Sequence, residues 1–345
     1  MKKRGFQLAL ILLAVSGLCS MASHFLVRWL KIETRSGHAW QIGSAESKTV
    51  AYLAGSSLSG DAIAWDQVRT ALDLRLAGWG VAGSSPWEWE VYQKNAADAK
   101  LQFVVVSPYD LNEEFLCDFH ADVVPPTDTI GDLWKSKSDW HFCKRVLSSY
   151  PLRYVRLLFP TVGRSQGVMA GLREKASSLL GRTGGSDEGA AGPSLSFNNE
   201  DSVPAYKKEK ISAWDSARIL RRLALMRNAC QGKHDFNGPK NLAFTRMLQQ
   251  GQRQGSLVVV VLPVSPTYMK EFMTPEVTKQ YEEALAQAQK SAPQARWIRL
   301  DSVAALHSND LYSDFVHMNP NGKKIATEAF MSQLSAMLSS NQSSL

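Results

Sequence analysis

The feature that most constrains this chain is the run Ser-Leu-Val-Val-Val-Val-Leu-Pro over residues 256–263, with six consecutive apolar residues. A strand of this composition has no polar face, so other elements must cover it on both sides. Buried strands of this kind are typical of parallel sheets. Residues 49–54 and 101–106 are shorter runs of the same character, and residues 297–301 form another. The four runs together predict a central parallel sheet.

Apolar residues at helical spacing fill the segments between these strands. They predict helices over residues 61–75, 87–97, 134–149, 214–230, 242–250, 274–289 and 323–338. Strands that alternate with helices are typical of a parallel sheet covered on both faces. The predicted fold class is therefore α/β, a three-layer α/β/α domain over residues 49–340 with a flavodoxin-like strand order. In such domains, functional residues gather at the carboxyl ends of the strands.

Residues 1–32 differ in composition from the rest of the chain. Basic residues at positions 2–4 are followed by residues 6–27, which contain no Asp, Glu, Lys or Arg. Such a segment is a signal peptide or a membrane-spanning anchor, and its length is sufficient for a span. We favour an uncleaved, single-pass transmembrane anchor whose basic end stays in the cytoplasm. The remainder is then extracytoplasmic, attached to the cell membrane through a polar tether over residues 33–48.

Composition also bears on a predicted insertion, on nucleic-acid binding and on the cysteines. Residues 180–205 are rich in Gly, Ser and Ala without periodicity, which predicts a flexible insertion, either a solvated loop or a lid. The formal net charge of +7 is spread along the chain, so we predict no nucleic-acid partner. The cysteines lack metal-ligand spacing. Cys117 and Cys143 form a disulfide if the compartment is oxidising, or they and Cys230 remain separate thiols.

The residues best suited to chemistry lie in two segments that are far apart in the sequence. Asp314 and His317 are three residues apart near the C-terminus, and Gly55-Ser56-Ser57 follows the first predicted strand. A serine is a weak nucleophile until a base accepts its proton, and a histidine base needs a carboxylate to fix its tautomer. The two segments together predict a triad with Ser57 as nucleophile, and Ser56 is the alternative. A helix-capping serine and a solvent-facing loop pair are the structural alternatives.

Residues 55–57, a Gly-centred turn at Gly83, and Asp314-x-x-His317 resemble the first, second and last sequence blocks of the SGNH/GDSL hydrolase superfamily. Within it, the chain is most similar to membrane-anchored, extracytoplasmic members with Gly-Ser-Ser in place of Gly-Asp-Ser. The D-alanine transfer proteins and the acetyltransferase-like proteins of polysaccharide modification are examples. The resemblance implies that Ser57 is the nucleophile, His317 its base and Asp314 the residue that orients the histidine. It also implies an oxyanion hole formed by the backbone N–H groups of Ser57 and Gly83.

The chain departs from the superfamily pattern at the oxyanion hole. The third block of the superfamily usually supplies an Asn side chain, and Tyr109 occupies the matching position in the turn over residues 107–110. Asn112 lies close by in the sequence and is an alternative donor. We predict that Tyr109, Asp110 and Ser265, which all follow predicted strands, contact the substrate.

These observations predict a membrane-anchored, extracytoplasmic serine acyltransferase or esterase. Its substrate would be an acyl group, with O-acetyl as the first choice, on a cell-envelope or exported polysaccharide. The resemblance implies a membrane-bound O-acyltransferase as a partner that supplies the acyl group. We find no phosphate-binding or dinucleotide-binding motif, and we predict no cofactor and no metal. The alternative is a non-catalytic envelope protein that binds glycan or the membrane partner through the same cleft.

Overall fold

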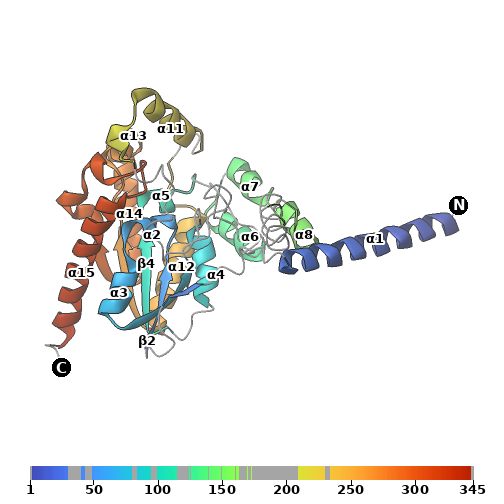
Figure 1. Cartoon of the computed structure of the whole chain (residues 1–345), viewed down its shortest axis with the longest axis horizontal. Helices are drawn as coiled ribbons and strands as arrows, with labels where there is room; N and C mark the ends of the chain where they lie inside the picture. The colour runs from blue at the N-terminus through green and yellow to red at the C-terminus, as the bar shows by residue number, and fades with distance from the viewer. Residues whose placement is uncertain are drawn as a thin grey trace, which may run out of the picture. The chain divides into compact units, whose positions relative to one another are not determined.

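The computed structural model describes residues 2–29, 40–42, 49–79, 84–94, 99–114, 124, 126–138, 140–148, 150–159, 161–162, 169, 172, 209–229 and 234–342. The chain forms two compact units. One contains Met1–His38 and Arg145–Ser196, and the other contains Ala39–Lys144 and Phe197–Leu345. The second unit contains the sheet (Figure 1).

The sheet has the predicted parallel core. Its order is β1-β3-β2-β4-β5-β6, in which the strands from β2 to β6 run parallel and β1 pairs antiparallel with β3. The five parallel strands therefore follow the predicted flavodoxin-like order. The strands are β1 (Trp40–Ile42), β2 (Thr49–Ala54), β3 (Leu74–Trp79), β4 (Leu101–Val106), β5 (Ser256–Val261) and β6 (Arg296–Arg299).

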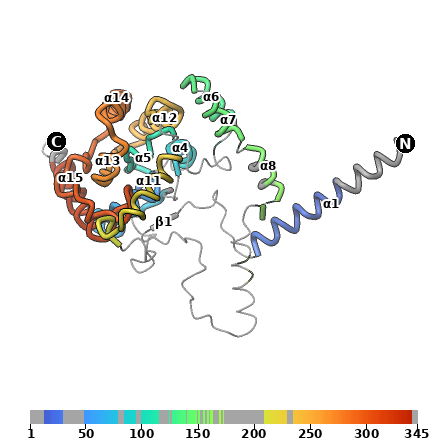
Figure 2. Tube along the Cα trace, turned by 90° about the horizontal axis from the view of Figure 1, so that it is seen from above, coloured from blue at the N-terminus to red at the C-terminus, as the bar shows by residue number. Residues whose placement is uncertain are grey.

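Helices cover both faces of this sheet, which confirms the α/β class. The helices described in this unit are α2 (Ser57–Ala62), α3 (Trp65–Ala71), α4 (Pro86–Lys94), α5 (Pro108–Leu111), α6 (Pro126–Lys135), α11 (Ser216–Ala229), α12 (Pro239–Gln254), α13 (Pro266–Phe272), α14 (Pro275–Ser291) and α15 (Pro320–Gln342), with short 3-10 turns at Ile211–Ala213, Leu300–Ser302, Ala304–Leu306 and Asn309–Leu311. Helix α7 (Trp140–Leu147) follows α6, and α12 lies between α4 and α14 (Figure 2).

Neighbouring residues of β4 show how the two layers of helices are held. The Phe103 ring contacts Trp65 of α3 and Phe330 of α15, with centroids 5.4 and 6.0 Å away. The adjacent Gln102 points to the other face, where its side chain accepts a hydrogen bond from Gln93 of α4 and donates one to Gln254 of α12. Successive side chains of a strand point to opposite faces, so this pair places the α3–α15 layer and the α4–α12 layer on opposite sides.

The predicted helix over residues 61–75 is confirmed only in part, because α3 (Trp65–Ala71) lies inside it but the helix does not extend over the whole range. Helix α2 ends at Ala62, α3 ends at Ala71, and Asp73 has a positive φ of 49° that turns the chain into β3. Leu74 and Leu76 are buried and alternate with half-buried residues, which is the period of a strand. The sequence pattern does not distinguish a strand from a helix here, because the leucines also fit one face of a helix.

Two other predicted boundaries also change. The predicted helix over residues 134–149 corresponds mainly to α7, because α6 ends at Lys135 and Lys137 has a positive φ of 52°. The predicted tether over residues 33–48 contains the edge strand β1. The predicted insertion over residues 180–205 lies outside the described residues, as do Cys117 and Cys230.

The first unit contains α1 (Lys2–Trp29), which coincides with the predicted anchor over residues 1–32, and α8 (Tyr150–Leu158). The Ser20 hydroxyl donates to the Leu158 carbonyl at 2.5 Å, and the Ser23 and Thr161 hydroxyls lie 2.8 Å apart, so α1 packs along the end of α8. Among the residues that the structure describes, no helix combines the length and hydropathy needed to cross a membrane.

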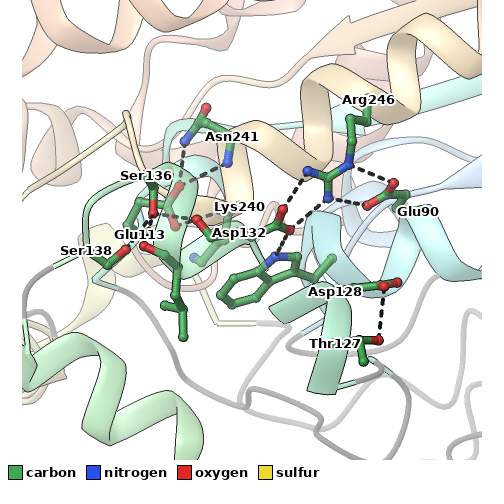
Figure 3. A network of polar contacts seen from close by, with 12 residues as sticks. Glu90, Glu113, Thr127, Asp128, Asp132, Ser136, Ser138, Lys240, Asn241 and Arg246 are labelled. Atoms are coloured by element: carbon green, nitrogen blue, oxygen red, sulfur yellow. Dashed lines mark hydrogen bonds and ion pairs between the residues drawn. The ribbon is translucent and has the colours of Figure 1, made fainter. Parts of the chain in front are cut away.

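A charged network ties α6 to the helical layer of α4 and α12 (Figure 3). The Arg246 guanidinium donates to both carboxylate oxygens of Glu90 and to both of Asp132, over 2.7–2.9 Å. Asp132 also accepts a hydrogen bond from the Trp87 indole at 3.0 Å. The Asp132 carboxylate is thereby paired in a buried position, where an unpaired charge would be costly.

The strand order fixes where a site is expected. The chain leaves β2 toward β3 on one side and leaves β4 toward β5 on the other, so the connections diverge between β2 and β4. In open α/β sheets, ligands bind in the crevice at such a switch point, beyond the carboxyl ends of the strands. Ser57 follows β2, and Tyr109 and Asp110 follow β4, so these predicted site residues flank the switch point.

Candidate active site

A tight turn between β2 and α2 presents Ser57. Ser56 has an extended backbone, and its hydroxyl accepts a hydrogen bond from the Leu58 N–H at 3.3 Å, which caps α2. Ser57 is the first residue of the helix and is half-buried. A Cβ on Gly55 would lie 2.7 Å from the Ser59 Cβ and 3.2 Å from the Val105 carbonyl. Glycine at this position therefore allows α2 to start close against the sheet.

The Asp314–His317 segment is an ordered loop between β6 and α15. An antiparallel bridge joins Tyr312 to Met318, and the Asn319 N–H donates to the Leu311 carbonyl at 2.9 Å. The Asn319 side chain accepts from the N–H groups of residues 321 and 322, at 3.0 and 3.1 Å, so it caps the start of α15. The Phe315 carbonyl accepts from the Ser265 N–H at 3.0 Å. The loop is thus fixed to α15 on one side and to the end of β5 on the other.

The structure brings Ser57, His317 and Asp314 together as a connected chain of side chains. The Ser57 hydroxyl lies 3.1 Å from His317 Nε2. On the other side of the ring, His317 Nδ1 lies 3.0 and 2.9 Å from the two carboxylate oxygens of Asp314. These distances are within the hydrogen-bonding range that a nucleophile, its base and the orienting carboxylate require.

The backbone around Asp314 favours its charged form. Its Oδ1 accepts hydrogen bonds from the N–H groups of His317 and Val316, at 2.8 and 3.0 Å. Burial alone would raise the pKa of Asp314, but the charge of His317 and these hydrogen bonds outweigh burial and hold the pKa well below its usual range. A permanently ionised Asp314 keeps the proton of a neutral His317 on Nδ1, which leaves Nε2 free to accept a proton from Ser57.

Ser56, the alternative nucleophile, is engaged away from His317. Its hydroxyl caps α2 and hydrogen-bonds with the carboxyl group of Asp110. Burial raises the pKa of Asp110, and the hydrogen bonds from Ser56 and Ser107 counteract that rise. Asp110 also completes a capping box with Ser107 at the start of α5. These contacts link the turn after β2 to the turn after β4 and give Ser56 a structural role.

The structure describes one of the two predicted oxyanion donors, Ser57. Ser57 opens α2, so its backbone N–H has no carbonyl acceptor four residues earlier within the helix. Gly83, the second predicted donor, lies outside the described residues. The next residue, Ser84, donates through its hydroxyl to the Gly55 carbonyl at 3.3 Å. Asn112 is not a donor to this site, because its side-chain amide lies 2.8 Å from His234 Nδ1 and its oxygen accepts from backbone N–H groups.

Two of the three predicted substrate-binding residues have other roles. Ser265 is fully buried, and its hydroxyl caps α13 by accepting from the Tyr268 N–H at 3.1 Å. Asp110 is also buried and is engaged with Ser56 and Ser107. Both side chains thus hold helix ends in this structure, and their contact with substrate stays a prediction. Tyr109 is half-buried, with its ring edge-on to Tyr268, and its contact with substrate stays a prediction.

Sequence reasoning missed two charged residues beside the triad. Asp61 Oδ2 lies 3.9 Å from His317 Nε2, and an Arg222 side-chain nitrogen lies 3.7 Å from Asp314 Oδ2. Asp61 follows Ser57 by four residues, so the two share one face of α2, a spacing that was visible in the sequence. Arg222 comes from α11, and no local pattern relates it to Asp314.

This arrangement is able to transfer a proton from Ser57 to His317 and to stabilise the resulting imidazolium with Asp314. Those are the requirements of nucleophilic acyl transfer by a serine. Neither a model of a known protein family nor a curated protein matches the sequence.

Proposed function

We propose that this chain is a serine acyltransferase or esterase of the SGNH type, acting on acyl groups of a cell-envelope or exported polysaccharide. The observation that carries the proposal is the continuous chain from Ser57 through His317 to Asp314, at 3.1 and 2.9 Å. Its location beyond the carboxyl ends of β2 and β6 supports the proposal, because α/β enzymes use that edge of the sheet.

The proposed reaction has two balanced steps. The Ser57 hydroxyl gives its proton to His317 Nε2 as its oxygen attacks the acyl carbonyl, and the Ser57 N–H donates to the oxyanion. The tetrahedral intermediate collapses, and the leaving alcohol takes the proton from Nε2. In the second step, an acceptor hydroxyl or water gives its proton to Nε2 and attacks the Ser57 ester. Collapse of this second intermediate returns the proton to Ser57 and releases the new ester or the free acid.

The polysaccharide substrate and the membrane location belong to the same proposal. The resemblance to extracytoplasmic polysaccharide-modifying proteins supports an O-acetyl substrate and a membrane-bound O-acyltransferase as partner. The basic residues at positions 2–4, followed by residues 6–27 of α1 without Asp, Glu, Lys or Arg, support a single-pass anchor with the sheet unit outside the cytoplasm. Alkaline extraction and protease protection of membranes from expressing cells test this part, and a chain released at high pH argues against the anchor.

A non-catalytic binding protein is the second candidate. The observation that favours it is the engagement of the Asn112 side chain with His234, since Tyr109 stands at the position of the usual Asn donor. One missing oxyanion donor typically lowers a rate by about 10²–10³-fold. A partner that completes the site would restore that loss.

The decisive experiment is hydrolysis of p-nitrophenyl acetate by the purified full chain, together with labelling by a fluorophosphonate probe. We expect turnover that falls to background in Ser57→Ala and His317→Ala, with the label on Ser57 located by mass spectrometry. Ser56→Ala tests the alternative nucleophile: turnover should fall because the cap of α2 is lost, but the label should stay on Ser57. A folded wild type without turnover and without label, in the presence and absence of membranes, would support the binding role.

A further inference from the structure

Charged groups from two other elements lie beside the Asp314–His317 pair. Asp314 contacts Nδ1, Asp61 lies 3.9 Å from Nε2, and Arg222 lies 3.7 Å from the Asp314 carboxylate. Asp61 comes from α2 and Arg222 from α11, so two separate elements bring opposite charges to the two ends of the Asp314–His317 pair.

The surroundings of these charges allow them to act on the ring. The side chains of Asp61, His317 and Asp314 are 22, 20 and 14% exposed. Water therefore screens the Asp61–His317 interaction only in part, and a charge about 4 Å away has a substantial effect at a partly buried site. Arg222 is 47% exposed and acts through Asp314, so its influence on the ring is smaller.

Two other arginines of α11 are engaged elsewhere. On α11 and just before it, Arg218 pairs with Glu209, and Arg227 pairs with Glu271 of α13. Arg218 also lies over the Trp214 ring, whose edge contacts Phe315 of the loop. These contacts hold α11 against the loop independently of Arg222. Replacing Arg222 therefore removes a charge without undocking the helix.

We propose that Asp61 and Arg222 are positioning residues whose opposite charges set the pH range in which His317 acts as the base for Ser57. The proposal rests on the proposed function. When His317 takes the Ser57 proton, that proton sits on Nε2 beside Asp61, which stabilises the imidazolium from the side opposite Asp314. Arg222 opposes this effect by neutralising part of the Asp314 charge. Asp61 thereby raises the pH at which His317 becomes a free base, and Arg222 lowers it.

The test is the protonation midpoint of His317, followed by histidine-selective ¹³C NMR on the full chain and assigned with His317→Gln. Asp61→Asn should lower the midpoint by about 0.5–1 pH unit, and Arg222→Gln should raise it by a smaller amount, about 0.3 pH unit. In the proposed reaction, the acid limb of the pH–rate profile should move in the same directions. High salt should reduce both shifts.

Matched controls remove the same charges from the same region. Asp66→Asn removes a carboxylate on α3 that pairs with Arg69, and Arg221→Gln removes the neighbouring guanidinium on α11. Both should leave the midpoint within about 0.2 pH unit of wild type. Shifts of the same sign in Asp61→Asn and Arg222→Gln, or no shift in either, would overturn the proposal. Because the NMR titration needs no turnover, this result is separable from a failure of the proposed catalytic function.

Discussion

Replacement of Asp314 by asparagine should disable the triad while leaving the loop intact. In the structure, Oδ1 accepts the N–H groups of both Val316 and His317, at 3.0 and 2.8 Å. The amide oxygen of the introduced asparagine should keep this position, because a side-chain NH₂ there would face two donors. The NH₂ group is then forced into the place of Oδ2, which lies 2.9 Å from His317 Nδ1.

The amide oxygen stays 3.0 Å from Nδ1, but the new N–H group 2.9 Å away disfavours a proton on Nδ1, so the tautomer that carries its proton on Nε2 gains population. That tautomer cannot accept the Ser57 proton across the 3.1 Å contact. The corresponding substitution in a well-studied serine protease lowers kcat about 10⁴-fold. We expect a loss of about 10³–10⁴-fold here, which corresponds to about 4–5.5 kcal/mol in the activation free energy. Stability should fall by no more than about 2 kcal/mol, because both backbone hydrogen bonds remain.

The assay is kcat for p-nitrophenyl acetate, with urea unfolding measured on the same samples. Asp310→Asn is the control, since Asp310 is exposed in the same loop region and its carboxylate accepts from the Ser212 hydroxyl instead of His317. It should retain wild-type turnover. A folded Asp314→Asn protein with kcat within about tenfold of wild type would refute the tautomer argument.

Three further predictions concern the framework of the site. Burial raises the pKa of Glu113 from 4.5 to about 7, so its folded form binds a proton more tightly, and stability should fall by about 3 kcal/mol as pH rises across that interval. The difference in unfolding free energy between pH 5 and 7.5, measured with urea, should disappear in Glu113→Gln. An unchanged difference in this variant would contradict the assignment. Gly55→Ala should destabilise the protein by about 1–3 kcal/mol and reduce turnover, because the new Cβ lies 2.7 Å from a side-chain carbon of α2. Gly131→Ala, inside α6 with nothing within 4 Å, is the control and should stabilise the protein slightly, by about 0.5–1 kcal/mol. Arg246→Met should cost about 3–5 kcal/mol by leaving Asp132 buried without its cation, and a second substitution, Asp132→Asn, should recover part of that loss.

The sequence was sufficient for four of the six strands described, β2, β4, β5 and β6, and for bringing the two distant segments of the triad to one edge of the sheet. β2 and β4 have the predicted bounds because their runs are apolar and end at residues that break strands. The Ser57–His317 contact was predictable because both residues follow strands whose ends share one edge of a parallel sheet. β3 was missed because its leucines also fit the period of a helix.

Side-chain roles in the turns were harder to predict. Ser265 and Asp110 lie at strand ends, as functional residues often do, yet both are buried caps. Serine and aspartate at such positions satisfy helix N–H groups as readily as they bind ligands, and the sequence does not separate these roles. Arg222 could not have been found, because its contact with Asp314 depends on how α11 docks on the loop.

The distance along the chain between Ser57 and His317 has a consequence for biosynthesis. The two residues are 260 positions apart, and the loop that holds His317 is anchored by the start of the last helix, α15. A ribosome completes Ser57 long before it reaches this loop. A nascent chain, or one truncated before residue 314, therefore carries a serine without its base, and the triad assembles only after residues 314–317 have been made.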